Sequence, residues 1–246
     1  MKKKCLLIFV GIILALVAAG AILLPKRIEL YDAINDNIET LGTEGKMFDA
    51  YDVTDDSLVQ VETDYLTMGV PQDCSLGDSQ IVYDYTNDDE SVYVGISQSV
   101  REEKIAFFNS GYTDKSKIFD IVYSLDDLRD GFEKLGYGIP DSTYNTYKCF
   151  YLLKEEDYSF WDYEKALAFA NTAFVKNEVA QMDVHYVYER DDMYALIMER
   201  NMTEEGKIYF YVDVFSPDDL NKSCLVLIRV EDRQQAYAMI NSIKVK

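Results

Sequence analysis

The first feature of the sequence is an uninterrupted apolar run. Cys5 to Leu24 form 20 consecutive residues without a charged or strongly polar side chain. As a helix, such a run is about 30 Å long, which matches the hydrocarbon thickness of a bilayer. The pattern therefore predicts one transmembrane helix close to the start of the chain.

The basic residues on either side of this run predict its orientation. Residues 2–4 are lysines, whereas Lys26 and Arg27 follow the run. Because basic flanks favour the cytoplasmic side, residues 1–27 are predicted to be a cytoplasmic tip and single-pass signal anchor in the cell membrane. The rest of the chain is then extracytoplasmic.

A cleaved signal peptide is the alternative interpretation. Ala19-Gly20-Ala21 resembles a small-residue cleavage motif, and cleavage near Ala21 would release a secreted protein. Ile22 to Leu24 continue the apolar run beyond that motif, which favours a retained anchor.

Residues 28–45 are predicted to form a stalk helix that leaves the bilayer. Apolar residues recur there at spacings of three and four, which is typical of one helical face. Glycine commonly follows the last turn of a helix, so Gly42 and Gly45 are expected to end it. The apolar positions are Ile28, Tyr31, Ile34, Ile38 and Leu41.

Residues 46–246 are predicted to form a single α+β domain. The period is first two, with turn-forming residues between short runs, which indicates a meander of antiparallel strands. The expected strands are 46–53, 58–61, 65–70, 80–85 and 91–98.

The middle of the domain is predicted to be helical. One helix runs over 125–135 with Ser124 as its cap and Gly136 beyond its end, and a second is capped by Asp141 or Ser142 and runs through Leu153. Asp162 is expected to cap a third, whose apolar face holds Ala166, Phe169, Ala170, Ala173 and Phe174. Trp161, at the entry of this third helix, is expected to be buried beneath the helices.

In the final third of the chain the period returns to two. Four strands with short joins are predicted over 182–189, 193–202, 207–215 and 224–230. Asp232 is expected to cap a last helix. Strands, helices, strands and a helix in this order predict an antiparallel sheet packed with helices, as a two-layer sandwich.

The charge of the chain restricts its partners. The protein carries a formal charge of −20, and residues 28–246, with 19 basic and 44 acidic side chains, carry −25. Such a surface repels phosphate backbones, which argues against a nucleic-acid partner and favours solubility or basic partners.

Catalytic and metal-binding patterns are missing from the sequence. The single histidine, His185, lies in an expected strand, and no G-x-S-x-G motif accompanies it. Cys74, Cys149 and Cys224 lie far apart, and the sequence leaves open whether two of them form a disulfide. Acidic clusters fall in expected turns, and the one at 84–90 lacks the glycine and the closing glutamate of an EF-hand. We therefore predict no catalytic residue, no cofactor and no metal ligand.

Tyrosines provide the one candidate ligand face. The chain has 20 tyrosines, and four of them recur at even spacing in two expected strands, so that each pair shares one face of its strand. A row of exposed tyrosines suits contact with a peptide or glycan, whereas half-buried strand tyrosines are a common structural alternative. The four are Tyr186, Tyr188, Tyr209 and Tyr211.

From Met182 to Lys246, long expected hairpins are followed by a helix that ends in Asn241-Ser242-Ile243-Lys244. This segment resembles the closing part of the PsbP-like fold of exported proteins, and Tyr65 to Pro71 is similar to an early strand of that fold. The anchored, acidic, tyrosine-rich style is also similar to that of membrane proteins exported by Gram-positive bacteria. The resemblance implies a non-enzymatic binding or assembly module.

Three hypotheses for function follow. The first is a membrane-anchored, extracytoplasmic binding or envelope-assembly module that contacts an envelope protein or a cell-wall glycan. The second is a cell-wall polymer hydrolase that uses two carboxylates, since such a pair is defined in space rather than in sequence. The third is a scaffold subunit of a membrane complex that makes its contacts through the anchor or the stalk.

Overall fold

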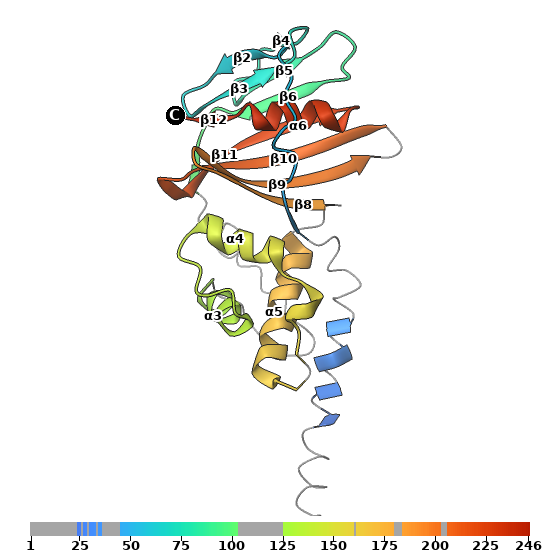
Figure 1. Ribbon diagram of the computed structural model, residues 1–246, viewed down its shortest axis with the longest axis vertical. Coiled ribbons are helices and arrows are strands. Elements are labelled where there is room, and N and C mark those ends of the chain that lie inside the picture. The colour runs from blue at the N-terminus through green and yellow to red at the C-terminus, as the bar shows by residue number, and fades with distance from the viewer. Residues whose placement is uncertain are drawn as a thin grey trace, which may run out of the picture.

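The computed structural model describes residues 24–25, 27–28, 30–32, 34–35, 45–102, 125–159, 161–179, 184–202 and 206–246. Figure 1 shows an elongated molecule with its sheets at one end, and with helices α3, α4 and α5 and the N-terminal helical residues at the other. The fold is mixed α+β, as the sequence predicts, with a large and mostly antiparallel sheet.

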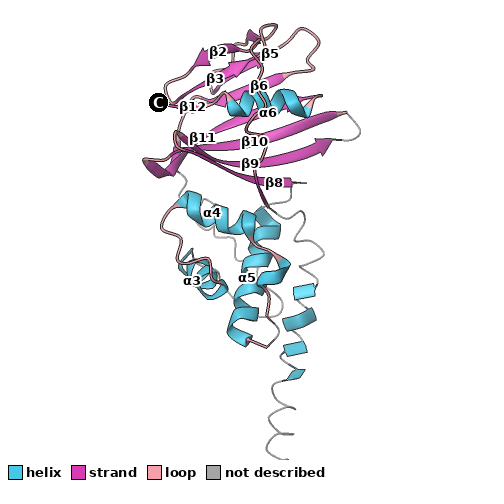
Figure 2. Ribbon diagram, in the orientation of Figure 1, coloured by secondary structure: helices cyan, strands magenta, loops and turns pink. Residues whose placement is uncertain are grey.

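A nine-stranded sheet forms the centre of the domain (Figure 2). Neighbouring strands in its main path are antiparallel apart from the first pair, β1 and β8, which is parallel. A further strand, β7 (Arg101–Glu102), pairs with β11. The path follows β1 (Lys46–Met47), β8 (Val184–Arg190), β9 (Met193–Met202), β10 (Lys207–Ser216), β11 (Asp219–Val230), β6 (Tyr93–Ser97), β5 (Val82–Thr86) and β4 (Ser75–Leu76).

The N-terminal strands do not form one continuous meander. A separate three-stranded sheet joins β2 (Val59–Glu62), β3 (Leu66–Val70) and the short C-terminal β12 (Lys244–Val245). Strand β1 is also shorter than the expected 46–53. The ring of Phe48, the residue that follows it, lies in a cluster of aromatic side chains, 4.7 Å from the ring of Tyr188.

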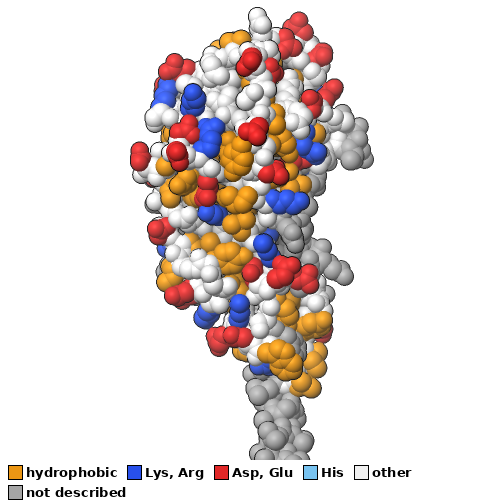
Figure 3. Space-filling view, viewed as in Figure 1, with side chains coloured by type: hydrophobic (Ala, Val, Ile, Leu, Met, Phe, Trp, Pro, Cys, Tyr) orange, Lys and Arg blue, Asp and Glu red, His pale blue; other side chains and the backbone are white. Residues whose placement is uncertain are grey.

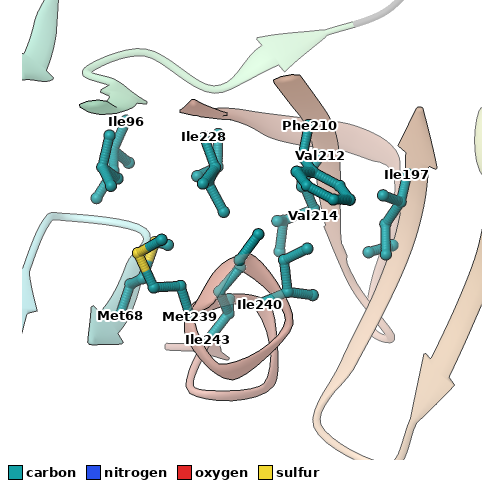
Figure 4. Packing of buried hydrophobic residues seen from close by; sticks show 14 of the residues in the cluster. Met68, Ile96, Ile197, Phe210, Val212, Val214, Ile228, Met239, Ile240 and Ile243 are labelled. Atoms are coloured by element: carbon teal, nitrogen blue, oxygen red, sulfur yellow. The ribbon is translucent and has the colours of Figure 1, made fainter. Parts of the chain in front are cut away.

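Helix α6 (Arg233–Asn241) lies between the two sheets. Asp232 caps it, as predicted, by accepting a hydrogen bond from the backbone of Gln234 at 2.9 Å. In Figure 4 Ile240 of this helix points toward hydrophobic side chains of the large sheet, and Met239 lies beside Met68 of β3. We call the side of the large sheet that faces α6 its first face.

Helix α4 (Thr143–Leu152) covers part of the opposite side, which we call the second face. The ring of Tyr144 lies 5.2 Å from Tyr194 and 5.3 Å from Phe215. Ser142 is the N-cap of α4, one of the two residues expected there, and accepts a hydrogen bond from the backbone of Asn145 at 3.3 Å. The large sheet therefore has helices on both faces, one layer more than the expected sandwich.

Helices α3 (Leu125–Leu135) and α5 (Tyr163–Val179) extend the helical layer away from the sheet (Figure 1). Gly136 follows α3 with a φ of 95°, the left-handed conformation that glycine tolerates best. A single turn of 3-10 helix, η1 (Glu155–Asp157), joins α4 to α5. The expected cap Ser124 lies outside the described residues.

The described N-terminal residues are helical and pack beside α5 (Figure 1), but with a different face from the expected one. Leu30 and Ile34 are buried with residues of α5, whereas Ile28 and Tyr31 are exposed. At 3.6 residues per turn, Leu30 lies about 40° from Ile34 around the helix and Ile28 about 120° away. Ile38, Leu41 and Gly42 lie outside the described residues.

Trp161 is exposed, contrary to the prediction that it is buried. Asp162 caps α5 by accepting a hydrogen bond from the backbone of Lys165 at 3.1 Å, and this fixes which residues face the helical core. Phe169 and Ala173 point inward, whereas Trp161 precedes the cap and remains outside the helical face.

Within the part of the chain that the structure describes, no helix is long and apolar enough to span a membrane. The predicted anchor, Cys5 to Leu24, lies outside those residues except for Leu24.

Candidate functional site

The four tyrosines of the candidate ligand face lie on both sides of the large sheet. Tyr186 pairs with Ile197 of β9, and Ile197 belongs to the core around α6, so Tyr186 and Tyr188 occupy the first face. Tyr209 and Tyr211 alternate with Phe210 and therefore occupy the second face. Each pair shares one face of its strand, but the two pairs do not form one row.

The first-face pair is part of the core. Tyr188 is 1% exposed and donates a hydrogen bond to Asn241 of α6 at 2.8 Å. Tyr186 donates to the carboxylate of Glu199 at 3.1 Å. Burial raises the pKa of Tyr186 far above its usual value, and the hydroxyl of Tyr237 and the charge of Glu199 reinforce the shift. This pair therefore joins the sheet to α6.

Tyr209 and Tyr211, the second-face pair, are only half-buried. Strand pairing places residues from distant parts of the chain beside them. Tyr209 lies opposite Arg229 of β11, and Arg229 in turn lies opposite Tyr93 of β6. Tyr211 lies opposite Leu227. All five side chains are half-buried and share the second face. We call these residues, Tyr93, Tyr209, Tyr211, Leu227 and Arg229, the Tyr-Arg surface.

Arg229 lies at the centre of the Tyr-Arg surface. Its guanidinium carbon is 5.5 Å from the centroid of the Tyr93 ring, a cation–π distance, and its Nη2 donates to the carbonyl of Glu90 at 3.1 Å. Its Nε is buried and has no hydrogen-bond partner among the described residues. The residue thus places a positive charge between two tyrosines of neighbouring strands.

Gly95 allows the Tyr93 ring to lie across β6. A β-carbon added at Gly95 would come within 2.9 Å of the Tyr93 hydroxyl and 3.1 Å of the ring carbon Cε1. Any larger residue would therefore displace the ring. Burial raises the pKa of the Tyr93 phenol, the charge of Asp84 adds to the shift, and the charge of Arg229 opposes it.

Basic side chains border the Tyr-Arg surface, although the whole chain is strongly acidic. Arg200, which is exposed, lies opposite Tyr209, and Lys207 of β10 donates to the carbonyl of Glu90 at 3.2 Å. Together with Arg229 they place three positive charges near two tyrosines. The combination favours ligands that offer flat apolar faces together with hydrogen-bond acceptors.

The sequence pointed to two of the five residues of this surface. Tyr209 and Tyr211 are predicted candidates, whereas Tyr93 and Arg229 lie in expected strands but carry no motif of their own. Their contact depends on β11 pairing with β6, whose residues lie more than a hundred positions earlier in the chain. Strand alternation identifies the outward side of each strand, but not its neighbour.

A buried charge lies on the first face near the start of α6. Glu199 is fully buried, and its Oε1 accepts hydrogen bonds from Nε of Arg233 at 3.0 Å and from Nη2 of the same residue at 2.5 Å. Asn201 donates to the same oxygen at 3.4 Å. The carboxylate is thus paired within the fold, which indicates a structural role.

A small cavity of about 320 Å³ lies beside α4 and the loop that precedes it. One carboxylate, Asp141, and one amine, Lys148, are among its lining residues. At its wall the Tyr137 hydroxyl donates to Asp157 at 2.5 Å, and burial raises the pKa of that phenol well above its usual value. The lining consists of Tyr137, Ile139, Pro140, Asp141, Asn145, Lys148, Cys149 and Leu152.

His185 and the cysteines are placed as buried or partly buried side chains. The His185 ring lies 4.8 Å from that of Tyr151, which belongs to α4. Cys74, Cys149 and Cys224 are all free thiols in the structure. In the described residues, no three His, Cys, Asp or Glu side chains come together in a way that could hold a metal ion.

The sequence matches no protein-family model and no curated protein.

Proposed function

We propose that this chain is a membrane-anchored, extracytoplasmic binding module that contacts a cell-wall glycan through the Tyr-Arg surface. The observation that carries the proposal is the position of Arg229 between Tyr209 and Tyr93 on three adjacent strands, with its guanidinium 5.5 Å from the centroid of the Tyr93 ring. A ligand oxygen at this surface would accept a hydrogen bond from the half-buried guanidinium.

A glycan fits the chemistry of this surface. Sugar rings present apolar faces that pack on tyrosine rings, and hydroxyl or carboxylate oxygens that accept hydrogen bonds from a guanidinium. Adjacent strands are about 4.8 Å apart, so Tyr209 and Tyr93, two strand spacings apart, span about 10 Å. Two linked sugar rings cover a comparable distance.

The location of the proposed function depends on the anchor. The apolar run from Cys5 to Leu24 and its basic flanks support a single-pass protein whose domain lies outside the cytoplasm. The resemblance of Met182 to Lys246 to the closing part of the PsbP-like fold also favours a binding module.

A hydrolase that uses two carboxylates is less well supported. Glycosidase carboxylates lie roughly 5–10 Å apart across the scissile bond. The described lining of the cavity beside α4 contributes one carboxylate, Asp141, while Lys148 faces the same space. The Tyr-Arg surface, by contrast, is half-buried sheet with basic neighbours.

Co-sedimentation of the full-length protein with insoluble cell-wall glycan tests the proposal. Arg229→Gln is expected to weaken binding about tenfold, equivalent to about 1.4 kcal/mol, and Tyr209→Ser to weaken it similarly. Tyr51→Ser, at an exposed tyrosine next to Tyr188, is the matched control and should bind normally.

Thermal unfolding of each variant separates lost binding from lost folding. Arg229→Lys is a second variant that keeps the charge but loses the planar set of donors, and it is expected to bind weakly. Undiminished sedimentation of folded Arg229→Gln would disprove the role of this surface. Release of soluble sugar fragments by the wild-type protein would instead support the hydrolase.

A further inference from the structure

The end of the molecule farthest from the small sheet exposes a set of large hydrophobic side chains. Trp161, the single tryptophan, is 85% exposed, more than any other large hydrophobic residue that the structure describes. Figure 3 shows hydrophobic side chains gathered at this lower end of the molecule. Exposed apolar groups of this size in one place usually mark an interaction site.

The N-terminal helical residues contribute to the same place. The side chain of Arg27 donates to the backbone carbonyl of Trp161 at 3.4 Å, which joins this segment to the entry of α5. Leu24, Ile28 and Tyr31 are 56%, 50% and 43% exposed. We call the set Leu24, Ile28, Tyr31 and Trp161 the tip patch.

The spacing of these residues shows that the N-terminal helical segment has two apolar sides. Leu24, Ile28 and Tyr31 are separated by four and three positions and therefore form one stripe. Leu30 and Ile34 form another, which is buried against the helices. The second stripe is therefore buried in the domain, whereas the side chains of the first are largely exposed.

We propose that the tip patch rests in the headgroup region of the lipid bilayer that holds the anchor, so that the helical end of the domain lies against the membrane. This proposal rests on the membrane anchor of the proposed function. Leu24 is both the last residue of the apolar run and the first residue of the tip patch.

The length of the helical segment agrees with contact between the tip patch and the headgroup region. Along a helix, Tyr31 lies about 10 Å beyond Leu24, and each interfacial layer of a bilayer is about 5–8 Å thick. Side chains of the tip patch close to Leu24 therefore fall within that layer or at its edge. Tryptophan and tyrosine are the residues enriched there, and Arg27 can direct its charge toward the headgroups.

The buried stripe fixes the orientation of the domain relative to the membrane. Because Leu30 and Ile34 pack against Phe169 and other core residues of the helices, the domain cannot turn freely about the chain that leads to the anchor. The two sheets then lie on the side away from the lipid, with β4 and β5 at the far end (Figure 1).

The fluorescence of Trp161 tests the proposal without any label, because no other tryptophan is present. Full-length protein is reconstituted into phosphatidylcholine vesicles, some of which carry brominated lipids with bromine near the headgroups or deep in the chains. We expect emission at shorter wavelength than in urea, and quenching that is strongest with bromine near the headgroups.

A matched control moves the reporter to the opposite end of the molecule. The double substitution Trp161→Phe and Leu76→Trp places the single tryptophan on β4, at an exposed position. We expect no quenching by either lipid. Equal quenching of both proteins would overturn the proposal, because it would not depend on the tip patch.

Flotation of the same vesicles distinguishes failure of the contact from failure of the anchor. Protein that floats after carbonate washing, but whose Trp161 is not quenched, would retain the anchor and overturn the lipid contact. Protein that does not float would overturn both. A blue-shifted, unquenched Trp161 that depends on protein concentration would instead show that a second copy covers the tip patch, which also overturns the lipid contact.

Discussion

The hydroxyl of Tyr188 donates a hydrogen bond to the side-chain carbonyl of Asn241 across 2.8 Å, which joins strand β8 to the last residue of α6. The amide of Asn241 donates in turn to the carbonyls of Ala50 at 2.6 Å and Val53 at 2.8 Å. One side chain therefore fixes the sheet, the helix and the loop after β1 to one another.

Asn241→Asp is predicted to destabilise the domain by about 3 kcal/mol, because two backbone carbonyls lose their donors and face a carboxylate. Tyr188→Phe removes one hydrogen bond and should destabilise it by about 1 kcal/mol. Urea unfolding followed by circular dichroism measures both. Asn35→Asp, at an exposed residue of the N-terminal helical segment, is the control. Equal effects of Asn241→Asp and Asn35→Asp would contradict the assignment.

Arg233→Met is predicted to destabilise the fold by about 3 kcal/mol, because it leaves the buried carboxylate of Glu199 without its cationic partner. The value is at the lower end for such pairs because the Arg233 side chain is 43% exposed. The double variant Arg233→Met with Glu199→Gln should recover part of this loss, since no charge remains buried. A double variant less stable than Arg233→Met alone would refute this account.

Gly45→Ala is predicted to destabilise the protein by several kcal/mol. A β-carbon at Gly45 would lie 1.7 Å from the backbone carbonyl oxygen of Tyr151, so the C-terminal turn of α4 would have to move. Gly131→Ala, within α3, is the matched control: its nearest contact would be the methyl group of Thr172 at 3.3 Å, and alanine favours the helix by about 1 kcal/mol. The melting temperatures of the two variants should therefore differ clearly. A similar melting temperature for both would show that Gly45 does not pack as described.

Cys74 and Cys149 are predicted to react slowly with iodoacetamide at neutral pH. Burial raises the pKa of each thiol to about 11; the charge of Asp73 adds to the shift at Cys74, and the charge of Lys148 opposes it at Cys149. Against an ordinary thiol pKa near 8.5, the reactive thiolate is depleted by about two orders of magnitude at pH 7.5.

The sign of the pH dependence follows from the same shift. A raised thiol pKa stabilises the fold below about pH 8.5, and this contribution disappears as the pH rises through about 11. Alkylation measured by mass spectrometry should therefore accelerate about tenfold per pH unit between pH 7.5 and 10. Labelling as fast in native protein as in urea would contradict the burial of these thiols.

Particular elements show how far the sequence alone predicts the fold. Strand β9 has the bounds expected from its alternating pattern, and Ser142 and Asp232 cap the helices that they were expected to cap. These features depend on neighbours within a few residues. Strand β12, in contrast, has two residues and no periodicity, and it exists because β3 offers an open edge for pairing.

The burial of single residues depended on more distant contacts. Trp161 is large and apolar, which favours the core, yet the cap at Asp162 directs it outward. Ile28 and Ile34 belong to one expected stripe, but only Ile34 meets the helices. A hydrophobic pattern indicates which residues gain from leaving water; it does not specify which of two apolar sides finds a partner.

The sequence by itself determined the apolar N-terminal run, the acidic charge, the order of strands and helices, and the face that each tyrosine pair shares on its strand. These properties follow from composition and local periodicity. Only the tertiary structure decided that Arg229 lies between Tyr209 and Tyr93, and that Glu199 is buried against Arg233. The physical reason is that strand pairing and helix docking bring together residues far apart in the chain, and their energies depend on the whole fold.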